Sequence, residues 1–156
     1  MKKVLILGAG LVVKPMVEFL LSNNYAVKIA TTTKEKADRM IKGHPNGSSL
    51  RWSSDETEVL DELVRQHDIV VSFLPYRYHA VAARACIKSG KPLVTTSYVQ
   101  PEIKVLEEAA KKSGTLLLNK IGLDPGIDHM TAMKVIDHIH SKGGQVEKFW
   151  SLCGAL

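Results

Sequence analysis

Apolar and polar positions alternate in blocks along this chain of 156 residues. Short apolar runs rich in β-formers are separated by longer stretches in which apolar residues recur at helical spacing. The apolar runs predict six strands, at residues 3–7, 26–30, 49–53, 68–74, 92–97 and 115–121. The stretches between them predict five helices, at residues 11–22, 31–43, 54–66, 77–89 and 101–113.

The strict alternation of strands and helices predicts an α/β fold. Several of the predicted strands are continuously apolar, which indicates a sheet covered on both faces. Right-handed crossovers between such strands produce a doubly wound parallel sheet, the Rossmann arrangement. On the first helix, the spacing predicts a buried face made of Val12, Met16, Phe19 and Leu20.

The pattern changes after the sixth strand. Residues 127–142 predict one more helix, and the alternating segment "QVEKFWSLCGAL" (145–156) predicts a strand. A sheet that is complete at six strands has no place for this further strand. We therefore expect the strand to be the first of a second domain that is truncated here. We therefore expect a nucleotide-binding Rossmann domain over residues 1–122, and a hinge, helix and first strand of a substrate domain over 123–156.

The segment "ILGAGLVVKP" follows the first strand and leads into the first helix. Gly8 suits a tight turn, and Gly10 would let the backbone approach a pyrophosphate held by the amides at the helix start. The third glycine of the dinucleotide fingerprint is replaced by Val13. Such a turn can be purely structural, but its place at the head of a βαβ series favours dinucleotide binding.

The end of the second strand lacks the acidic residue that NAD-binding domains use on the ribose 2′-hydroxyl. The sequence there is "ATTTKEK", with threonine hydroxyls followed by Lys34 and Lys36. Hydroxyls beside lysines suit a 2′-phosphate, which favours NADP over NAD. The threonines also serve as caps for the next helix.

Polar segments follow the fourth, fifth and sixth strands. They are "SFLPYRYH", "TTSYVQP" and "GLDPGIDH". Because ligands bind beyond the carboxyl ends of parallel strands, we expect these segments to form one pocket. We expect Phe73 and Pro75 to line its nicotinamide side, and Tyr76 and His79 to serve in packing or capping. We expect "GLDPGIDH" to be the hinge between domains, and His129 to be packed or partly exposed.

Composition and charge narrow the classes of partner that this chain is expected to bind. The net charge is +5, but the lysines and arginines are scattered, so we expect no nucleic-acid partner. No apolar run approaches the ~20 residues of a membrane span, so we expect no membrane association. Cys86 and Cys153 fit no metal spacing, which predicts no metal site and favours a reducing, cytoplasmic compartment.

Four of these segments and the chain's last residues carry a resemblance to a known family. The glycine loop "GAG", with "LPYRYH", "VTTSYVQP", "GLDPGIDHM" and "SLCGAL", is similar to saccharopine reductase, the NADP-dependent saccharopine dehydrogenase that forms L-glutamate. The resemblance implies an oxidoreductase of lysine metabolism that interconverts saccharopine with L-glutamate and 2-aminoadipate 6-semialdehyde. It covers essentially the whole chain, which resembles only the front part of the family's proteins.

The resemblance also implies a set of site residues. The cofactor-binding residues are Gly8, Ala9, Gly10 and Leu11 on the pyrophosphate, Ala30, Thr31 and Thr32 near the ribose, Trp52 and Ser53 beside the adenine, and Phe73, Thr95, Thr96, Gly122, Leu123 and Asp124. The substrate-binding residues are Ser97, Tyr98 and Asp124, and Asp124 is the catalytic candidate. Two positions depart from the family, because Thr32 stands where relatives can carry Arg and Lys120 replaces an acid.

Two other functions stay open at this point. One is a related imine-reducing dehydrogenase of polyamine metabolism, and the other is an NADP-binding module without chemistry. The hydroxyl cluster "TTSY" beside "GLDPG" favours an enzyme with a small amino-acid substrate, whose carboxylates Arg77 or Lys120 could bind. The alternating apolar residues of the final segment favour pairing between copies, so a homodimer is one expected arrangement.

Overall fold

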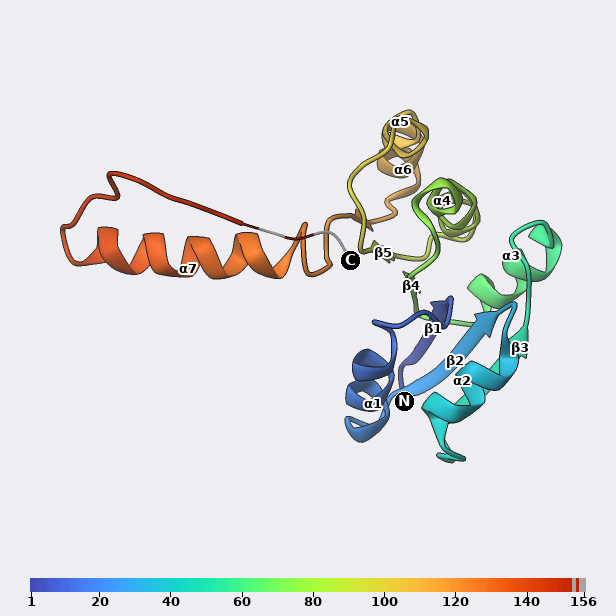
Figure 1. Cartoon of the computed structure of the whole chain (residues 1–156). Coiled ribbons are helices and arrows are strands. Elements are labelled where there is room, and N and C mark those ends of the chain that lie inside the picture. The colour runs from blue at the N-terminus through green and yellow to red at the C-terminus, as the bar shows by residue number, and fades with distance from the viewer. Residues whose placement is uncertain (153, 155–156) are drawn as a thin grey trace.

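The computed structural model describes residues 1–152 and 154. Its central feature is a six-stranded sheet with the strand order β3-β2-β1-β4-β5-β6 (Figure 1). Every pairing in this sheet is parallel. The predicted doubly wound parallel sheet is therefore confirmed, and the chain order reverses direction between β1 and β4, where such folds bind nucleotides.

The strands are short and their carboxyl ends lie at one edge of the sheet. They are β1 (Lys3–Leu7), β2 (Ala26–Thr31), β3 (Gly47–Arg51), β4 (Ile69–Ser72), β5 (Leu93–Thr95) and β6 (Leu117–Leu118). The register places Leu7 of β1 opposite both Ala30 of β2 and Ser72 of β4. The loops that follow these three strands therefore begin at the same level.

Helices connect the strands and cover both faces of the sheet. They are α1 (Lys14–Ser22), α2 (Lys34–Ile41), α3 (Thr57–Arg65), the 3-10 turn η1 (Tyr76–Tyr78), α4 (His79–Ser89), α5 (Pro101–Lys104), α6 (Glu107–Ser113) and α7 (Ile127–Ser141). The predicted helix over 101–113 is interrupted at Val105 and Leu106. The predicted strand over 115–121 is reduced to Leu117 and Leu118, the two residues that pair with the short strand β5.

Alternate strand residues divide the core into two layers. On β1, Val4 and Ile6 pack against α1 and α2, whereas Leu5 and Leu7 pack against α3 and α4. Because side chains alternate between faces in a strand, a run such as "VLIL" fills both layers at once. This packing holds the strand ends, and with them the loops that follow, at fixed positions.

The predicted buried face of the first helix is wrong in part. Val12 and Phe19 are 69% and 63% exposed, whereas Val13, Val17 and Leu21 are buried. Residues 11–13 form the turn after the glycine loop, and α1 begins only at Lys14. The face that meets the sheet is therefore the i, i+4, i+8 row starting at Val13, with Met16 and Leu20 packed beside it.

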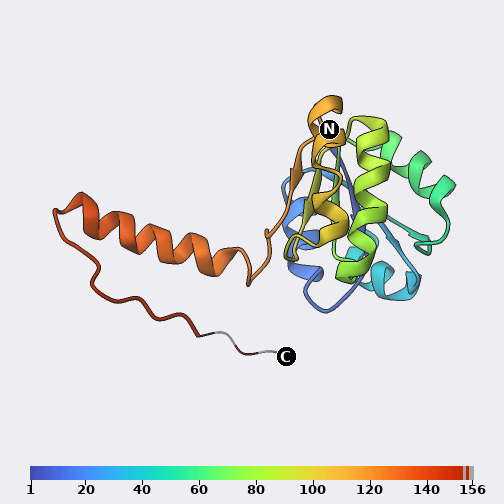
Figure 2. The same cartoon turned by 90° about the horizontal axis from the view of Figure 1, so that it is seen from above.

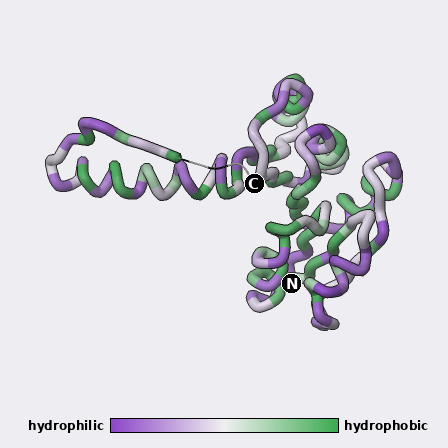
Figure 3. The backbone as a smooth tube through the Cα atoms, viewed as in Figure 1, coloured by the Kyte–Doolittle hydropathy of each residue, from purple (hydrophilic) through white to green (hydrophobic). Residues whose placement is uncertain are grey.

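The last part of the chain leaves the body of the molecule. Figures 1 and 2 show α7 projecting away from the sheet and its helices, with the following segment running back along it. No residue of α7 is buried, although Figure 3 shows hydrophobic positions recurring along it. Among the described residues, no helix has the length and apolar character to span a membrane.

The predicted strand over 145–156 is wrong for the residues that the structure describes. Residues 145–152 form neither helix nor strand, and Cys153, Ala155 and Leu156 of that prediction lie outside the described residues. A strand exists only when its backbone groups find a partner strand. Alternation alone therefore did not suffice, since no strand of the described residues pairs with residues 145–152.

Candidate functional site

The glycine loop turns sharply between β1 and α1. The amide of Gly8 donates to the carbonyl of Ala30 at 2.8 Å, which ties the loop to the end of β2. Gly8 has φ +101°, and a Cβ there would lie 3.2 Å from the carbonyl oxygen of Phe73. This position therefore requires glycine, as the sequence predicted for a tight turn.

Gly10 leaves open space at the helix start. A Cβ built on it would meet no atom within 4 Å. Within the described chain, the amides of Gly10, Leu11 and Val12 donate to no backbone carbonyl, and the side chain of Leu11 is fully exposed. Unpaired amides at the start of a helix, with no acidic residue in its first turn, suit an incoming anion.

A cleft of about 660 Å³ opens beside this loop. Eight of the predicted cofactor residues line it, contributed by the loops after four different strands: Gly8, Ala9, Gly10, Thr31, Thr32, Trp52, Ser53 and Phe73. Ala30 lies just beneath, fully buried at the end of β2. The order of the sheet thus gathers residues from positions 8 to 73 around one cavity.

The end of the cleft near β2 carries hydroxyls and one cation. Thr31, Thr32 and Thr33 line it together with Lys36. Lys34 does not line it, because its ammonium is 2.7 Å from the carboxylate of Asp38 in the next turn of α2. Lys36 is therefore the lysine placed to meet a phosphate in this part of the cleft.

Trp52 forms the floor of the cleft beyond β3. Its indole is 1% exposed, and its Nε1 donates to the carbonyl of Glu56 at 3.1 Å. The amide of Ser53 donates to the Glu56 carboxylate at 2.7 Å, which fixes the loop before α3. Thr33 belongs to the predicted threonine hydroxyls, whereas the sequence missed three further lining residues, which are Ser54, Leu74 and Tyr78. Their only signal was their place shortly after a strand.

The remaining predicted residues form a second group, beyond β5 and β6 at the same edge of the sheet. Thr95 is buried, and its hydroxyl donates to the Asn119 side chain at 2.8 Å. Its carbonyl accepts from the amide of Ile121, and the carbonyl of Ser97 accepts from the amide of Lys120. These bonds hold the segment from Thr95 to Ser97 alongside the segment that leads to Gly122.

The loop from Gly122 to Gly126, which was predicted to be the hinge and is called the hinge loop below, closes on itself. The Gly122 amide donates to the Pro125 carbonyl at 2.9 Å, and the Ile127 amide donates to the Gly122 carbonyl at 2.9 Å. The peptide bond before Pro125 is cis. A Cβ on Gly126 would lie 2.2 Å from the Gly122 carbonyl oxygen, and one on Gly122 would lie 2.7 Å from that of Thr96. Both glycines are therefore needed for this close approach.

Asp124 lies in this loop and faces the second group. The hydroxyl of Tyr98 donates to its carboxylate at 3.0 Å, and the ammonium of Lys120 lies 5.9 Å from the centre of the Tyr98 ring. This pairing joins the catalytic candidate Asp124 to one of the other two predicted substrate residues. Leu123, beside it, is 72% exposed.

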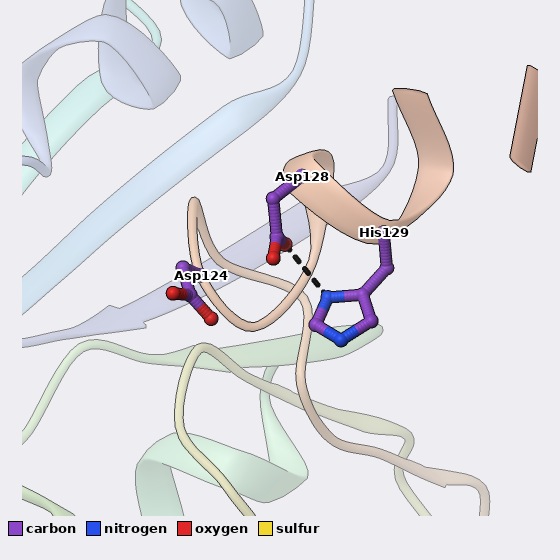
Figure 4. A group of neighbouring side chains, drawn as sticks. All are labelled: Asp124, Asp128 and His129. Atoms are coloured by element: carbon purple, nitrogen blue, oxygen red, sulfur yellow. Dashed lines mark hydrogen bonds and ion pairs between the residues drawn. The ribbon is translucent and has the colours of Figure 1, made fainter. Parts of the chain in front are cut away.

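Asp128 and His129 lie next to Asp124 at the start of α7 (Figure 4). The Asp128 carboxylate accepts from the amide of Gly126 and pairs with Nδ1 of His129, both at 2.8 Å. Desolvation opposes ionisation of Asp128, but these hydrogen bonds outweigh it and lower the pKa of the carboxyl. His129 was expected to be packed or partly exposed; it is exposed, so the expectation of packing is wrong.

His79 is fully buried at the start of α4, with 1% of its surface exposed. Its two ring nitrogens contact Ser72, at the end of β4, and Ser97, after β5. Burial away from water lowers the pKa of the imidazole, so the ring is neutral near pH 7. The expected packing role is therefore incomplete, because the ring also links Ser72 at the end of β4 to Ser97 of the second group.

Comparison with known families identifies the chain. The family model for the saccharopine dehydrogenase NADP binding domain matches residues 4–118, and the model for the saccharopine dehydrogenase C-terminal domain matches residues 122–156. The chain belongs to the saccharopine dehydrogenase family. The resemblance predicted from the sequence motifs is confirmed.

Relatives in this family match along the whole chain. Saccharopine dehydrogenase [NADP(+), L-glutamate-forming] of Schizosaccharomyces pombe is 42% identical over 100% of this chain and 35% of its own length. The enzyme of the same name from Saccharomyces cerevisiae is 37% identical over 99% of this chain and 35% of its own length. This chain therefore spans about a third of the length of these saccharopine dehydrogenases.

A solved structure agrees with the fold. The apo, histidine-tagged saccharopine dehydrogenase (L-Glu forming) from Saccharomyces cerevisiae has a TM-score of 0.81 and 34% identity to this chain. The match covers 92% of this chain and 32% of that one. The saccharopine dehydrogenase fold thus extends over most of this chain.

Proposed function

We propose that this chain is the NADP-binding part, with the start of the C-terminal domain, of an L-glutamate-forming saccharopine dehydrogenase. The observation that carries the proposal is the 42% identity, over the whole chain, to a relative whose name specifies this cofactor and product. We also propose that the domain border lies at Gly122, since the two family models meet between residues 118 and 122.

The cleft fits a dinucleotide in shape and chemistry. The open space at Gly10 and the unpaired loop amides suit the pyrophosphate, and the hydroxyls of Thr31 and Thr32 with Lys36 suit a ribose 2′-phosphate. No carboxylate lines this cleft to repel that phosphate. Trp52 and Ser53 would bound the adenine side, and Phe73 the side toward the nicotinamide.

When bound, NADP would supply the acceptor for hydride. The protein residues would orient the reacting carbon and handle a proton. Ser97 and Tyr98 would hydrogen-bond the amino-acid substrate at the edge of β5, beside the nicotinamide end. Asp124 would exchange the proton, because its carboxylate is already hydrogen-bonded to the Tyr98 hydroxyl and lies in the hinge loop between the domains.

The substrate side is incomplete in the residues present. A polyanionic amino acid needs cations, and Lys120, above the Tyr98 ring, is the nearest candidate. We therefore propose that cofactor binding belongs to this chain, and that efficient turnover belongs to the complete enzyme. We also propose a cytoplasmic, reducing location, which the buried free thiol of Cys86 supports because it has no disulfide partner among the described residues.

The proposal is tested in two steps. Calorimetry on the purified chain should show binding of NADP, and an assay of the complete enzyme should show saccharopine-dependent reduction of NADP. Turnover with a polyamine-derived imine and none with saccharopine would assign the chain to a different dehydrogenase. Binding of NADP without turnover of either substrate in the complete enzyme would make it a non-catalytic module.

A further inference from the structure

A buried hydrogen-bonded chain links the sheet to the predicted substrate residues. It runs from the Ser72 hydroxyl to His79 Nδ1 at 2.9 Å, and from His79 Nε2 to the Ser97 hydroxyl at 3.0 Å. Ser72 and His79 are 0% and 1% exposed, whereas Ser97 is only partly buried. The chain of bonds thus begins in the core and ends at the surface of the proposed site.

The direction of each bond follows from the partners of Ser72. Its hydroxyl hydrogen is buried, and a buried hydroxyl that fails to donate carries a free-energy penalty. Among the described residues, the only hydrogen-bond partner of the Ser72 hydroxyl is His79 Nδ1. Ser72 must therefore donate to Nδ1, which leaves that nitrogen without a proton.

The absence of a proton on Nδ1 of His79 determines where the proton of the ring lies. A neutral imidazole carries one proton, and here it resides on Nε2. Nε2 then donates to the Ser97 oxygen, so Ser97 accepts from the core side. The hydrogen of the Ser97 hydroxyl is left to donate away from the core, toward the edge where β5 ends.

We propose that His79 is a positioning residue that orients the Ser97 hydroxyl as a donor to a carboxylate oxygen of the substrate. This inference rests on the proposed function, which places the amino-acid substrate at Ser97. A donor with a fixed direction suits an anionic acceptor, and its bond needs no reorientation on binding. The opposite tautomer would turn Ser97 into an acceptor, which would repel a carboxylate.

The tautomer is measured directly by ¹⁵N-detected long-range NMR of the histidine rings in this chain. His67 provides an internal control, because its Nδ1 lies 2.6 Å from the carbonyl of Leu63. A carbonyl only accepts, so His67 must carry its proton on Nδ1. We expect opposite tautomers for these two buried histidines in one spectrum, and a proton on Nδ1 of His79 would overturn the inference.

Two serine variants test the direction of the chain of bonds. Ser72→Ala removes the donor to Nδ1, so the single tautomer of His79 should be lost. Ser97→Ala removes only the acceptor, so the proton should remain on Nε2. The reverse pattern would show that Ser97 sets the tautomer, and would overturn the proposed direction.

The effect on substrate is measured in the complete enzyme. His79→Ala should raise the KM for saccharopine about 10-fold, the effect of one lost hydrogen bond to a charged group, with the KM for NADP unchanged. His79→Gln should restore most of the loss, since its amide can reach Ser97, whereas the shorter His79→Asn should not. Equal changes in both KM values, or no rescue by Gln, would reduce His79 to a packing residue.

The experiments can contradict the proposed function and the positioning role of His79 independently. If the starting chain does not bind NADP, the proposed function is wrong, while the tautomer experiment still reports on the chain of bonds. If NADP binds and saccharopine is turned over but His79 carries its proton on Nδ1, only the positioning role is wrong.

Discussion

Gly10 and Lys36 carry most of the predicted selectivity of the cofactor cleft at the scale of single residues. Gly10 has empty space where a side chain would stand, and Lys36 lines the cleft without an ion-pair partner among the described residues. Both features concern the phosphates of a dinucleotide, and each is tested by a substitution with a matched control.

Gly10→Asp should abolish most NADP binding. The backbone of Gly10 is not strained and a Cβ meets no atom, so the variant should fold. Its carboxylate would stand against the pyrophosphate, and like charges at such short range predict a loss of at least about 100-fold in affinity. Gly10→Asn, which adds the same bulk without charge, should lose much less. Calorimetry that gives equal affinities for Gly10→Asp and the starting chain would show that the pyrophosphate lies elsewhere.

Lys36→Gln should weaken NADP binding about 10-fold and leave NAD binding unchanged, because only NADP carries the 2′-phosphate. Lys34→Gln is the matched control. It removes the same charge from the same helix, but Lys34 is held by Asp38 outside the cleft and should affect neither cofactor. Titration of all three proteins with both cofactors distinguishes a specific contact with the 2′-phosphate from a general effect of charge. An equal effect of the two substitutions would mean that general charge, and no specific contact, sets the preference.

The hinge loop is the decisive unit at the scale of elements, because two glycines allow its backbone to close. Gly126→Ala would force a Cβ to within 2.2 Å of the Gly122 carbonyl oxygen, at a φ of +150°. We expect the hydrogen bonds of the loop to open, so that amide exchange at Gly122 and Ile127 accelerates at least about 10-fold.

Gly143→Ala is the control for that experiment. Gly143 also has positive φ, but an added Cβ meets nothing within 4 Å. It should cost about 1–2 kcal/mol locally and leave exchange in the hinge loop unchanged. If exchange at Gly122 and Ile127 is the same in both variants, the close approach of the two glycines does not hold the loop together.

The sequence predicted the elements best where burial fixes the pattern. Central strands such as β1 and β4 are apolar on both faces, and this signal located them closely. It located the edge strand β6 poorly, because only Leu117 and Leu118 of the predicted segment pair with the short strand β5. It misjudged the buried face of α1, because the turn at residues 11–13 delays the start of the helix.

Local motifs predicted which residues form the site. They did not predict the hydrogen bonds between residues far apart in the sequence. Residues that follow strands, such as Gly8, Thr31 and Phe73, converge because the parallel topology requires it. The contact of His79 with Ser97 depends on how far α4 sits from β5, which no local pattern encodes. Likewise, the predicted strand after residue 145 needed a partner strand that the sequence does not reveal.

At the scale of the whole molecule, one compact Rossmann unit carries an appendage that exposes apolar surface. Trp150 and Leu152 are 83% and 98% exposed, and Met130 and Met133 are half exposed on α7. Surface of this kind favours association. We predict a concentration-dependent homodimer through this appendage.

Light scattering after gel filtration should therefore give a mass that rises above 17.2 kDa with concentration. Trp150→Ser should shift the protein toward the monomer. Phe19→Ser removes an aromatic ring that is 63% exposed on α1, away from the appendage, and should leave the mass unchanged. A monomer at every concentration, or equal effects of the two variants, would contradict this prediction.

The central claim, that this chain binds NADP in the cleft beside the glycine loop, is tested most directly by titrating the chain with NADPH and NADH while recording its amide spectrum. The account predicts saturable binding, with NADPH preferred at least about 10-fold and the largest shifts at Gly10, Thr32 and Lys36. No saturation with NADPH, or shifts confined to α7 and the hinge loop, would contradict it.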